Sequence, residues 1–180
     1  MRSKLTKRDA LLAAAAMLTR RGMQVYKVRD AEPDAKYLYF PRECSVPDCR
    51  RPFPAWNKDL PAEEGWLRVE MRAVGTGWTN KSRHLLCPRC VAAGLEAARR
   101  FAEHLLTWSR ITFPRFNRLT DAPTIIYATI CDSWVKRGWA EWRRTDDGHE
   151  VVLTNRTKIR KWLDKLARLA EEKVTAMEEK

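Results

Sequence analysis

Two pairs of cysteines constrain this chain more than any other feature of its sequence. Cys44 and Cys49 form the first pair, and Cys87 and Cys90 form the second about forty residues later. Two nearby cysteines on a tight turn can direct both sulfurs at one tetrahedral Zn²⁺ ion, and a proline within each pair favours such a turn because its φ angle is fixed. The pattern therefore predicts a structural zinc site of four thiolates, with no open position for a catalytic water.

Two other interpretations of the cysteines stay open at this point. They could be reduced side chains that fill a small core, or they could form disulfides in a secreted protein. Residues 10–18 are apolar and follow basic residues, as in a signal peptide, but residues 19–22 read Thr-Arg-Arg-Gly where a small-residue cleavage site is expected. We therefore expect a cytoplasmic protein without disulfides. His84, three residues before Cys87, is an alternative ligand, and Cys131 has no partner at ligand spacing and is expected to be a small buried residue.

The segment between the two pairs reads as a β-hairpin. Residues 66–71 and 82–86 have the composition of strands, and Gly75-Thr76-Gly77 marks a turn between them. An amphipathic helix follows Cys90 directly. The order of knuckle, hairpin, knuckle and helix resembles treble-clef and zinc-ribbon modules. The resemblance implies that residues 1–92 form an N-terminal helix and a zinc-stabilised β module.

The N-terminal forty residues are predicted to pack on this module. Thr6 and Asp9 have the spacing of a capping box, so a helix is expected to begin there and to end near Gly22. Residues 23–28 and 36–40 are strand candidates. One helix and one hairpin make a marginal core on their own, so we expect them to share the core of the zinc module.

The second half of the chain predicts three helices and another hairpin. The helix after Cys90 ends at Pro114, and a helix capped by Thr120 or Asp121 ends at Gly138. Asp147-Gly148 then predicts a tight hairpin turn, followed by a long helix over residues 157–179. Residues 134–154 resemble the MarR-type pattern of a recognition-helix end, a Gly, a strand, an Asp-rich turn and a second strand. The resemblance implies a winged-helix-like domain over residues 93–180, in which the helix enters the major groove and the hairpin reaches an adjacent groove or the backbone.

Charge indicates the kind of partner. The chain has 35 Lys and Arg against 23 Asp and Glu, a formal net charge of +12, which favours a polyanion such as DNA. It contains no apolar run near the ~18 residues of a membrane-spanning helix, and no helix joins a broad apolar face to a uniformly basic one. The residues predicted to contact nucleic acid are Arg50, Arg51, Lys81, Arg83 and Arg89 beside the cysteines, Thr129, Ser133 and Lys136 on the candidate recognition helix, and Arg143 and Arg144 before the hairpin turn.

The last helix carries an apolar seam. Its apolar residues recur near heptad spacing over three repeats, namely Ile159, Trp162, Leu163, Leu166, Leu169, Ala170, Val174 and Met177. A helix this long predicts a homodimer formed through residues 157–179. Packing across the chain's own zinc module is the alternative.

The sequence thus predicts an α+β protein, a small zinc-stabilised β-hairpin module followed by a winged-helix-like helical domain with a long C-terminal helix. We found no phosphate-cradling Gly-rich loop and no nucleophile motif. HNH nucleases share the zinc, hairpin and helix layout, but His84 is the sole histidine on the hairpin and His104 lies two turns too far along the helix. The leading hypothesis is a non-enzymatic protein that binds double-stranded DNA as a transcriptional regulator or accessory factor. The alternative is a phage-type inhibitor that binds a host nucleic-acid-processing complex.

Overall fold

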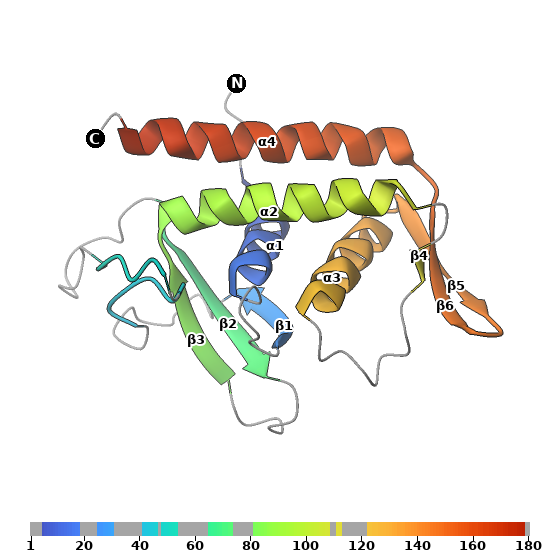
Figure 1. Cartoon of the computed structure of the whole chain (residues 1–180), viewed down its shortest axis with the longest axis horizontal. Coiled ribbons are helices and arrows are strands. Elements are labelled where there is room, and N and C mark those ends of the chain that lie inside the picture. Colours follow the sequence, from blue (N-terminus) through green and yellow to red (C-terminus); the bar gives the residue numbers. More distant parts are fainter. Residues whose placement is uncertain are drawn as a thin grey trace.

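The chain has a mixed α+β fold in which helices and two small antiparallel sheets alternate (Figure 1). The computed structural model describes residues 5–18, 25–30, 41–46, 48–53, 65–73, 81–108, 111–112 and 122–178. The helices in these ranges are α1 (Lys7–Leu18), α2 (Pro88–Leu106), α3 (Ala122–Lys136) and α4 (Arg156–Glu178). The strands are β1 (Val25–Asp30), β2 (Leu67–Ala73), β3 (Lys81–Leu86), β4 (Ile111–Thr112), β5 (Ala140–Thr145) and β6 (Gly148–Leu153).

The hairpin predicted between the cysteine pairs and the one predicted near the end of the chain are both present, and β1 pairs with β2. The first sheet has the order β1-β2-β3, and Val69 pairs with His84 in its central hairpin. The second sheet has the order β4-β6-β5. Thr145 pairs with Gly148, so the turn residues are Asp146 and Asp147, one position earlier than predicted. The predicted strand at 36–40, the Gly75–Gly77 turn, Gly22 and residues 113–121 lie outside the described residues.

Helix ends follow the local signals in the sequence. The backbone N–H of Asp9 donates to the Thr6 hydroxyl at 3.2 Å, and that hydroxyl donates to the Asp9 carboxylate at 2.6 Å, which confirms the capping pair at the start of α1. Gly138 follows α3 with a φ of 71°, a left-handed conformation that glycine adopts without steric cost. Local capping signals therefore account for the start of α1 and for the end of α3.

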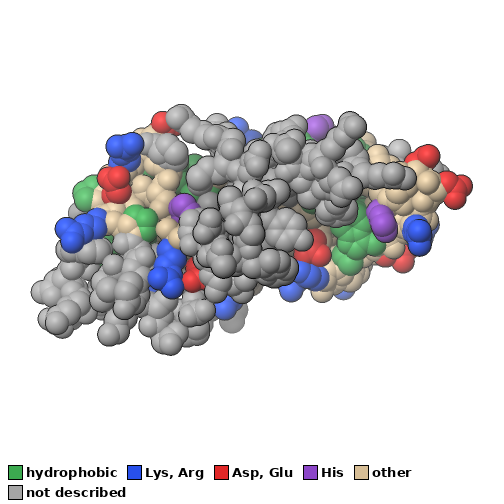
Figure 2. Space-filling view, turned by 90° about the horizontal axis from the view of Figure 1, so that it is seen from below, with side chains coloured by type: hydrophobic (Ala, Val, Ile, Leu, Met, Phe, Trp, Pro, Cys, Tyr) green, Lys and Arg blue, Asp and Glu red, His purple; other side chains and the backbone are tan. Residues whose placement is uncertain are grey.

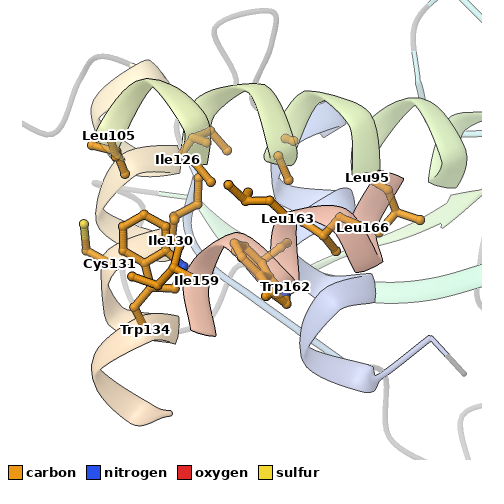
Figure 3. Packing of buried hydrophobic residues seen from close by; sticks show 14 of the residues in the cluster. Leu95, Leu105, Ile126, Ile130, Cys131, Trp134, Ile159, Trp162, Leu163 and Leu166 are labelled. Carbon is orange, nitrogen blue, oxygen red and sulfur yellow. The ribbon is translucent and has the colours of Figure 1, made fainter. Parts of the chain in front are cut away.

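Helix α2 is the central element of the molecule. Helix α4 lies alongside it in the opposite direction, and α1 and α3 pack on its other side (Figure 1). The larger apolar core lies where α2, α3 and α4 meet (Figure 3) and includes Leu95, Leu105, Ile126, Ile130, Trp134, Ile159, Trp162, Leu163 and Leu166. The smaller core joins α1, the first sheet and three of the cysteines.

The predicted division at residues 92 and 93 falls inside α2. Val91 belongs to the smaller core and Leu95, one turn later, belongs to the larger core. Helix α1 also contributes to both cores, with Leu12 in the larger and Leu18 in the smaller. The two predicted regions therefore share two helices.

The apolar seam of α4 packs on the chain's own body. Its residues 159, 162, 163, 166, 169 and 170 are all buried within the single chain, and Val174 is 43% exposed. The covered part of the seam packs with α2 and its neighbours in the larger core, and no residue of α4 belongs to the smaller core that contains the cysteines. The homodimer stays a prediction.

A buried carboxylate ties α1 to α3 and α4. Asp9 has no exposed surface, and its Oδ1 accepts hydrogen bonds from the Arg137 guanidinium at 2.8 Å and from the Trp162 indole N–H at 2.9 Å. Its Oδ2 accepts one from Lys165 at 3.0 Å. Burial alone would raise the pKa of Asp9, but hydrogen bonds from Thr6, Trp162 and Lys165 together with the charge of Arg137 lower it overall. Asp9 is therefore a charged junction of three helices as well as a capping residue.

Helices α1 and α2 cross so closely that Gly94 has no room for a side chain. A Cβ atom added there would lie 2.8 Å from the carbonyl carbon of Ala13 and 3.0 Å from its Cα, and these are backbone atoms that move only with the whole helix. We expect Gly94→Ala to destabilise the protein by about 2 kcal/mol, because overpacking outweighs the gain in helix propensity. Chemical denaturation measures this change. Ala93→Gly, on the exposed side of α2, reports the propensity difference alone, and a neutral or stabilising Gly94→Ala would contradict the close crossing.

Candidate metal centre

The first cysteine pair lies on a closed backbone turn. The N–H of Cys49 donates to the carbonyl of Val46 at 2.9 Å, and the N–H of Cys44 donates to the carbonyl of Arg51 at 2.8 Å. Arg50 has a φ of 43°, which is uncommon for a residue with a side chain and reverses the chain direction directly after Cys49. This turn therefore accommodates the four residues that separate Cys44 from Cys49, two more than separate Cys87 from Cys90.

The second pair lies at the start of α2. Cys87 is the N-cap residue with extended φ and ψ angles of −72° and 160°, Pro88 is the first helical residue, and Cys90 lies in the first turn. The helix therefore begins before Cys90, not after it as the sequence analysis expected, because proline is favoured at the first helical position where its missing N–H is not needed. Pro47, which was expected to bend the first turn, lies outside the described residues.

The four sulfur atoms converge on one point. The Sγ atoms of Cys44, Cys49, Cys87 and Cys90 all lie within 4.8 Å of one another, and those of Cys49 and Cys87 are 3.6 Å apart. Sulfurs on a tetrahedral zinc with bonds of ~2.3 Å are separated by roughly 3.8 Å, so the cluster fits such an ion. All the cysteines are free, and His84 is not part of the group. The predicted clustering of these four residues is confirmed.

Within the cluster, the thiolate form is favoured at Cys44 and the thiol form at Cys90. Hydrogen bonds from the Cys87 and Cys90 thiols lower the pKa of Cys44, and the same sharing raises the pKa of Cys90. The backbone N–H of Cys87 also donates to the Cys44 sulfur at 3.4 Å. The positive end of α2 faces this site, which further stabilises negative sulfur. A divalent cation can take the place of the shared protons and hold all four sulfurs as thiolates.

Ser45 fastens the first turn to the sheet, a role that its sequence context did not reveal. Its N–H donates to the carbonyl of Leu85 at 2.7 Å, and its hydroxyl accepts from the N–H of Leu85 at 3.0 Å. Phe53 and Trp66 pack edge to face beneath the turn with ring centroids 4.9 Å apart. The link could not be predicted from the sequence, because it depends on a strand that lies about forty residues further along the chain.

The cations beside the cysteines are exposed where the structure describes them. The predicted set is Arg50, Arg51, Lys81, Arg83 and Arg89; the four arginines are exposed, and the side chain of Lys81 is outside the described part. Arg83 pairs with the buried Glu70 at 3.4 Å. Four thiolates and one Zn²⁺ carry a net charge of about −2, which exposed arginines nearby partly offset.

The three predicted contact residues on α3 differ in how far they are exposed to solvent. Thr129 is half-buried, and Lys136 is exposed and pairs with Asp132 at 2.6 Å. Ser133 is buried, and its hydroxyl has no hydrogen-bond partner among the described residues. Ser133 was predicted to contact nucleic acid, but the turn of the helix directs it toward the core beside Trp134.

The β5–β6 hairpin exposes both predicted arginines but is acidic overall. Arg143 pairs with Glu141 at 2.7 Å, and Arg144 is exposed. Residues 140–153 contain these two arginines and four acidic residues, namely Glu141, Asp146, Asp147 and Glu150. Figure 2 shows acidic side chains at the end of the molecule where Figure 1 places this hairpin.

The remaining predictions concern single residues and the membrane. Cys131 is fully buried as predicted, and burial raises the pKa of its thiol to about 12. His104, considered for a nuclease, has its Nδ1 2.7 Å from the Tyr127 hydroxyl. Among the described residues, no helix is long and apolar enough to cross a bilayer.

Comparison of the chain with protein-family models, with curated protein sequences and with solved structures finds no significant match.

Proposed function

We propose that this protein is a zinc-stabilised, non-enzymatic protein that binds double-stranded DNA as a transcriptional regulator or accessory factor. The observation that carries the proposal is the order of elements after α2. Strand β4 pairs with β6, and α3 precedes the β5–β6 hairpin, giving the sheet order β4-β6-β5. This order is the one expected of a winged-helix domain of the kind that the MarR-like pattern implies. The net charge of +12 supports a polyanionic partner.

In this proposal the metal is a structural zinc ion. Cys44, Cys49, Cys87 and Cys90 would hold it as a closed four-thiolate site between a turn, a hairpin and the start of a helix, as in a treble-clef module. Three of the four cysteines are buried in the smaller core. A bound ion would then fix the first turn of α2 and, through that helix, the position of the elements that follow it.

A second candidate function has its own support. The acidic β5–β6 hairpin and the buried Ser133 make the two contact elements of a winged helix poor readers of DNA. A protein that binds a nucleic-acid-processing complex, such as a phage-type inhibitor of a host polymerase or nuclease, needs neither feature. An acidic hairpin is suited to the basic surface of such a complex.

Fluorescence anisotropy with labelled duplexes separates the two candidates. If about four phosphates are contacted, the association constant should fall by roughly a hundredfold between ~50 and ~200 mM salt. A regulator should also prefer one duplex over bulk DNA, which competition with unlabelled duplexes measures. No measurable binding to any duplex at low salt would contradict the DNA-binding function. Capture of a polymerase or nuclease complex from host extract by the same preparation would then support the inhibitor.

A further inference from the structure

The outer face of α4 is divided into a basic half and an acidic half. Residues 156–168 contain six Lys or Arg and a single acidic residue, Asp164. Residues 169–178 contain three Glu and one Lys. The basic half is the first half of the helix, next to the β5–β6 hairpin, and the acidic half extends over the start of α2 (Figure 1). Neither half was assigned a role from the sequence.

Two of the six cations have partners that hold the fold together. Arg156 donates to the backbone carbonyls of Leu106 and Trp108 at 2.8 and 3.3 Å, and Lys165 donates to Asp9. The other four, which we call the α4 basic face, make no ion pair with the described residues and are exposed. They are Lys158, Arg160, Lys161 and Arg168.

The dimensions of the α4 basic face suit a nucleic-acid backbone. With a rise of ~1.5 Å per residue, the span from Lys158 to Arg168 is about 15 Å. Duplex DNA carries one phosphate charge per ~1.7 Å of its axis, so several phosphates lie within that span. Lys161 and Arg168 project from the side of the helix opposite Ile159 and Leu166, which are buried in the larger core, and Lys158 and Arg160 flank that side.

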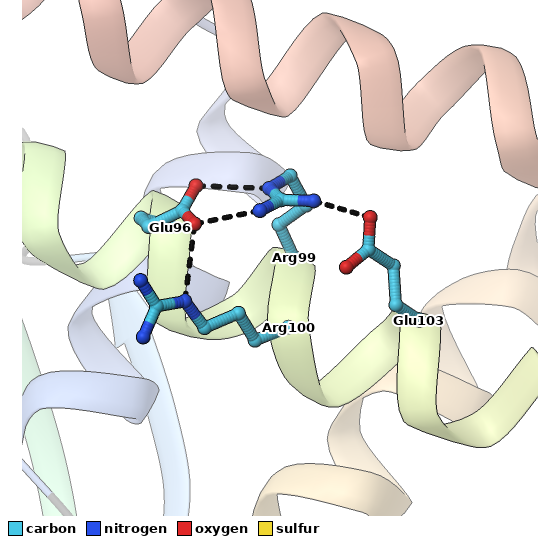
Figure 4. Close-up of polar contacts among 4 residues, drawn as sticks. All are labelled: Glu96, Arg99, Arg100 and Glu103. Atoms are coloured by element: carbon cyan, nitrogen blue, oxygen red, sulfur yellow. Dashed lines mark hydrogen bonds and ion pairs between the residues drawn. The ribbon is translucent and has the colours of Figure 1, made fainter.

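Several cations on the other described helices pair with acidic residues, and the hairpin carries an excess of acid. On α2, Glu96 accepts from Arg99 at 2.7 Å and from Arg100 at 3.1 Å, and Arg99 also pairs with Glu103 (Figure 4). On α3, Lys136 pairs with Asp132. The hairpin has twice as many acidic residues as arginines. The α4 basic face has one acidic neighbour, Asp164, against four exposed cations without a described ion pair, so it keeps a surplus of positive charge.

We propose that the α4 basic face is the main contact surface for the phosphate backbone of double-stranded DNA, in place of the hairpin arginines. This inference rests on the proposed DNA-binding function. Glu171, Glu172 and Glu178 on the second half of α4 repel phosphates, so the duplex crosses the first half of the helix and does not continue toward the metal centre.

Two variants with the same loss of charge test the inference. Lys161→Gln with Arg168→Gln should weaken duplex binding at least about tenfold near 100 mM salt and reduce the salt slope by one to two units. Arg143→Gln with Arg144→Gln should change the affinity less than about threefold. Both are measured by anisotropy on the full chain, and unchanged melting temperatures show that each variant is folded.

The outcomes separate the inference from the proposed function. If the wild type binds duplexes and the α4 variant binds as tightly as the wild type, the inference is overturned while the DNA-binding function stands. A large loss of duplex affinity in the hairpin variant alone would also overturn the inference and leave the DNA-binding function standing. If the wild type binds no duplex at low salt, the DNA-binding function itself fails.

Discussion

Cys90→Ser is expected to abolish metal binding and to unfold the smaller core. Cys90, Cys87 and Cys44 are buried members of that core, so removing one ligand leaves three polar sulfurs among apolar side chains. The apparent binding free energy of structural zinc is on the order of 10 kcal/mol, which is comparable to the whole stability of a domain. The purified wild type should contain one zinc per chain by elemental analysis, and the variant should contain none and aggregate or lose its cooperative thermal transition.

Cys131→Ala is the matched control for the metal experiment. This fifth cysteine is equally buried but lies on α3, away from the four clustered sulfurs. The control should keep one zinc per chain and lose only the modest stability of a small cavity, about 1 kcal/mol. A metal-free wild type, or a Cys90→Ser variant with an unchanged melting temperature, would show that the four cysteines are packing residues and not ligands.

Asp9→Asn should be the second most damaging change. The variant keeps the size of the side chain but removes the charge that Arg137 and Lys165 share, and their side chains are only 16% and 25% exposed. Leaving buried cations without a counter-ion typically costs about 3–5 kcal/mol, so we expect a loss of about 4 kcal/mol in the free energy of unfolding. Asp164→Asn on the exposed face of α4 is the control and should change stability by less than about 0.5 kcal/mol.

The same carboxylate predicts a pH dependence. The pKa of Asp9 is lower in the folded chain than in the unfolded one, where a carboxyl titrates near ~3.9. Its contribution is therefore fully present above the unfolded value and is lost as the pH falls through the lower folded value. Urea denaturation between about pH 6 and pH 2 should show the difference between wild type and Asp9→Asn narrowing once the pH falls below about 4. A constant difference across this range would exclude a charged Asp9 as the source of the stabilisation.

Features with a local cause were predicted well from the sequence. The cysteine clustering, both hairpins, the Thr6–Asp9 cap and the helix stop at Gly138 each depend on a few neighbouring residues. The start of α2 was misplaced by a few residues because Pro88 fits both a metal turn and a first helical position. Spacing alone does not distinguish these two uses of proline.

Features that depend on tertiary contacts were missed. Asp9 was interpreted as a capping residue because its partners Trp162 and Lys165 lie more than 150 positions away. Ser133 was chosen as a contact residue because a helix with apolar residues on most of its sides gives little indication of which side faces water. The packing of the first turns of α4 in the larger core was not identified either, because an apolar periodicity reveals that a partner exists but does not say which one.

The late position of α4 in the chain has a consequence for synthesis on the ribosome. The apolar side of α2 is covered by residues 159–170, and the Asp9 carboxylate receives two of its partners, Trp162 and Lys165, from the same segment. Until those residues leave the exit tunnel, the nascent chain exposes an incomplete core, and Asp9 has Arg137 but not Lys165 as a counter-ion. Ribosome-bound chains that stop before residue 156 should therefore be open to proteases and chaperones, and protection should appear in one step once α4 emerges.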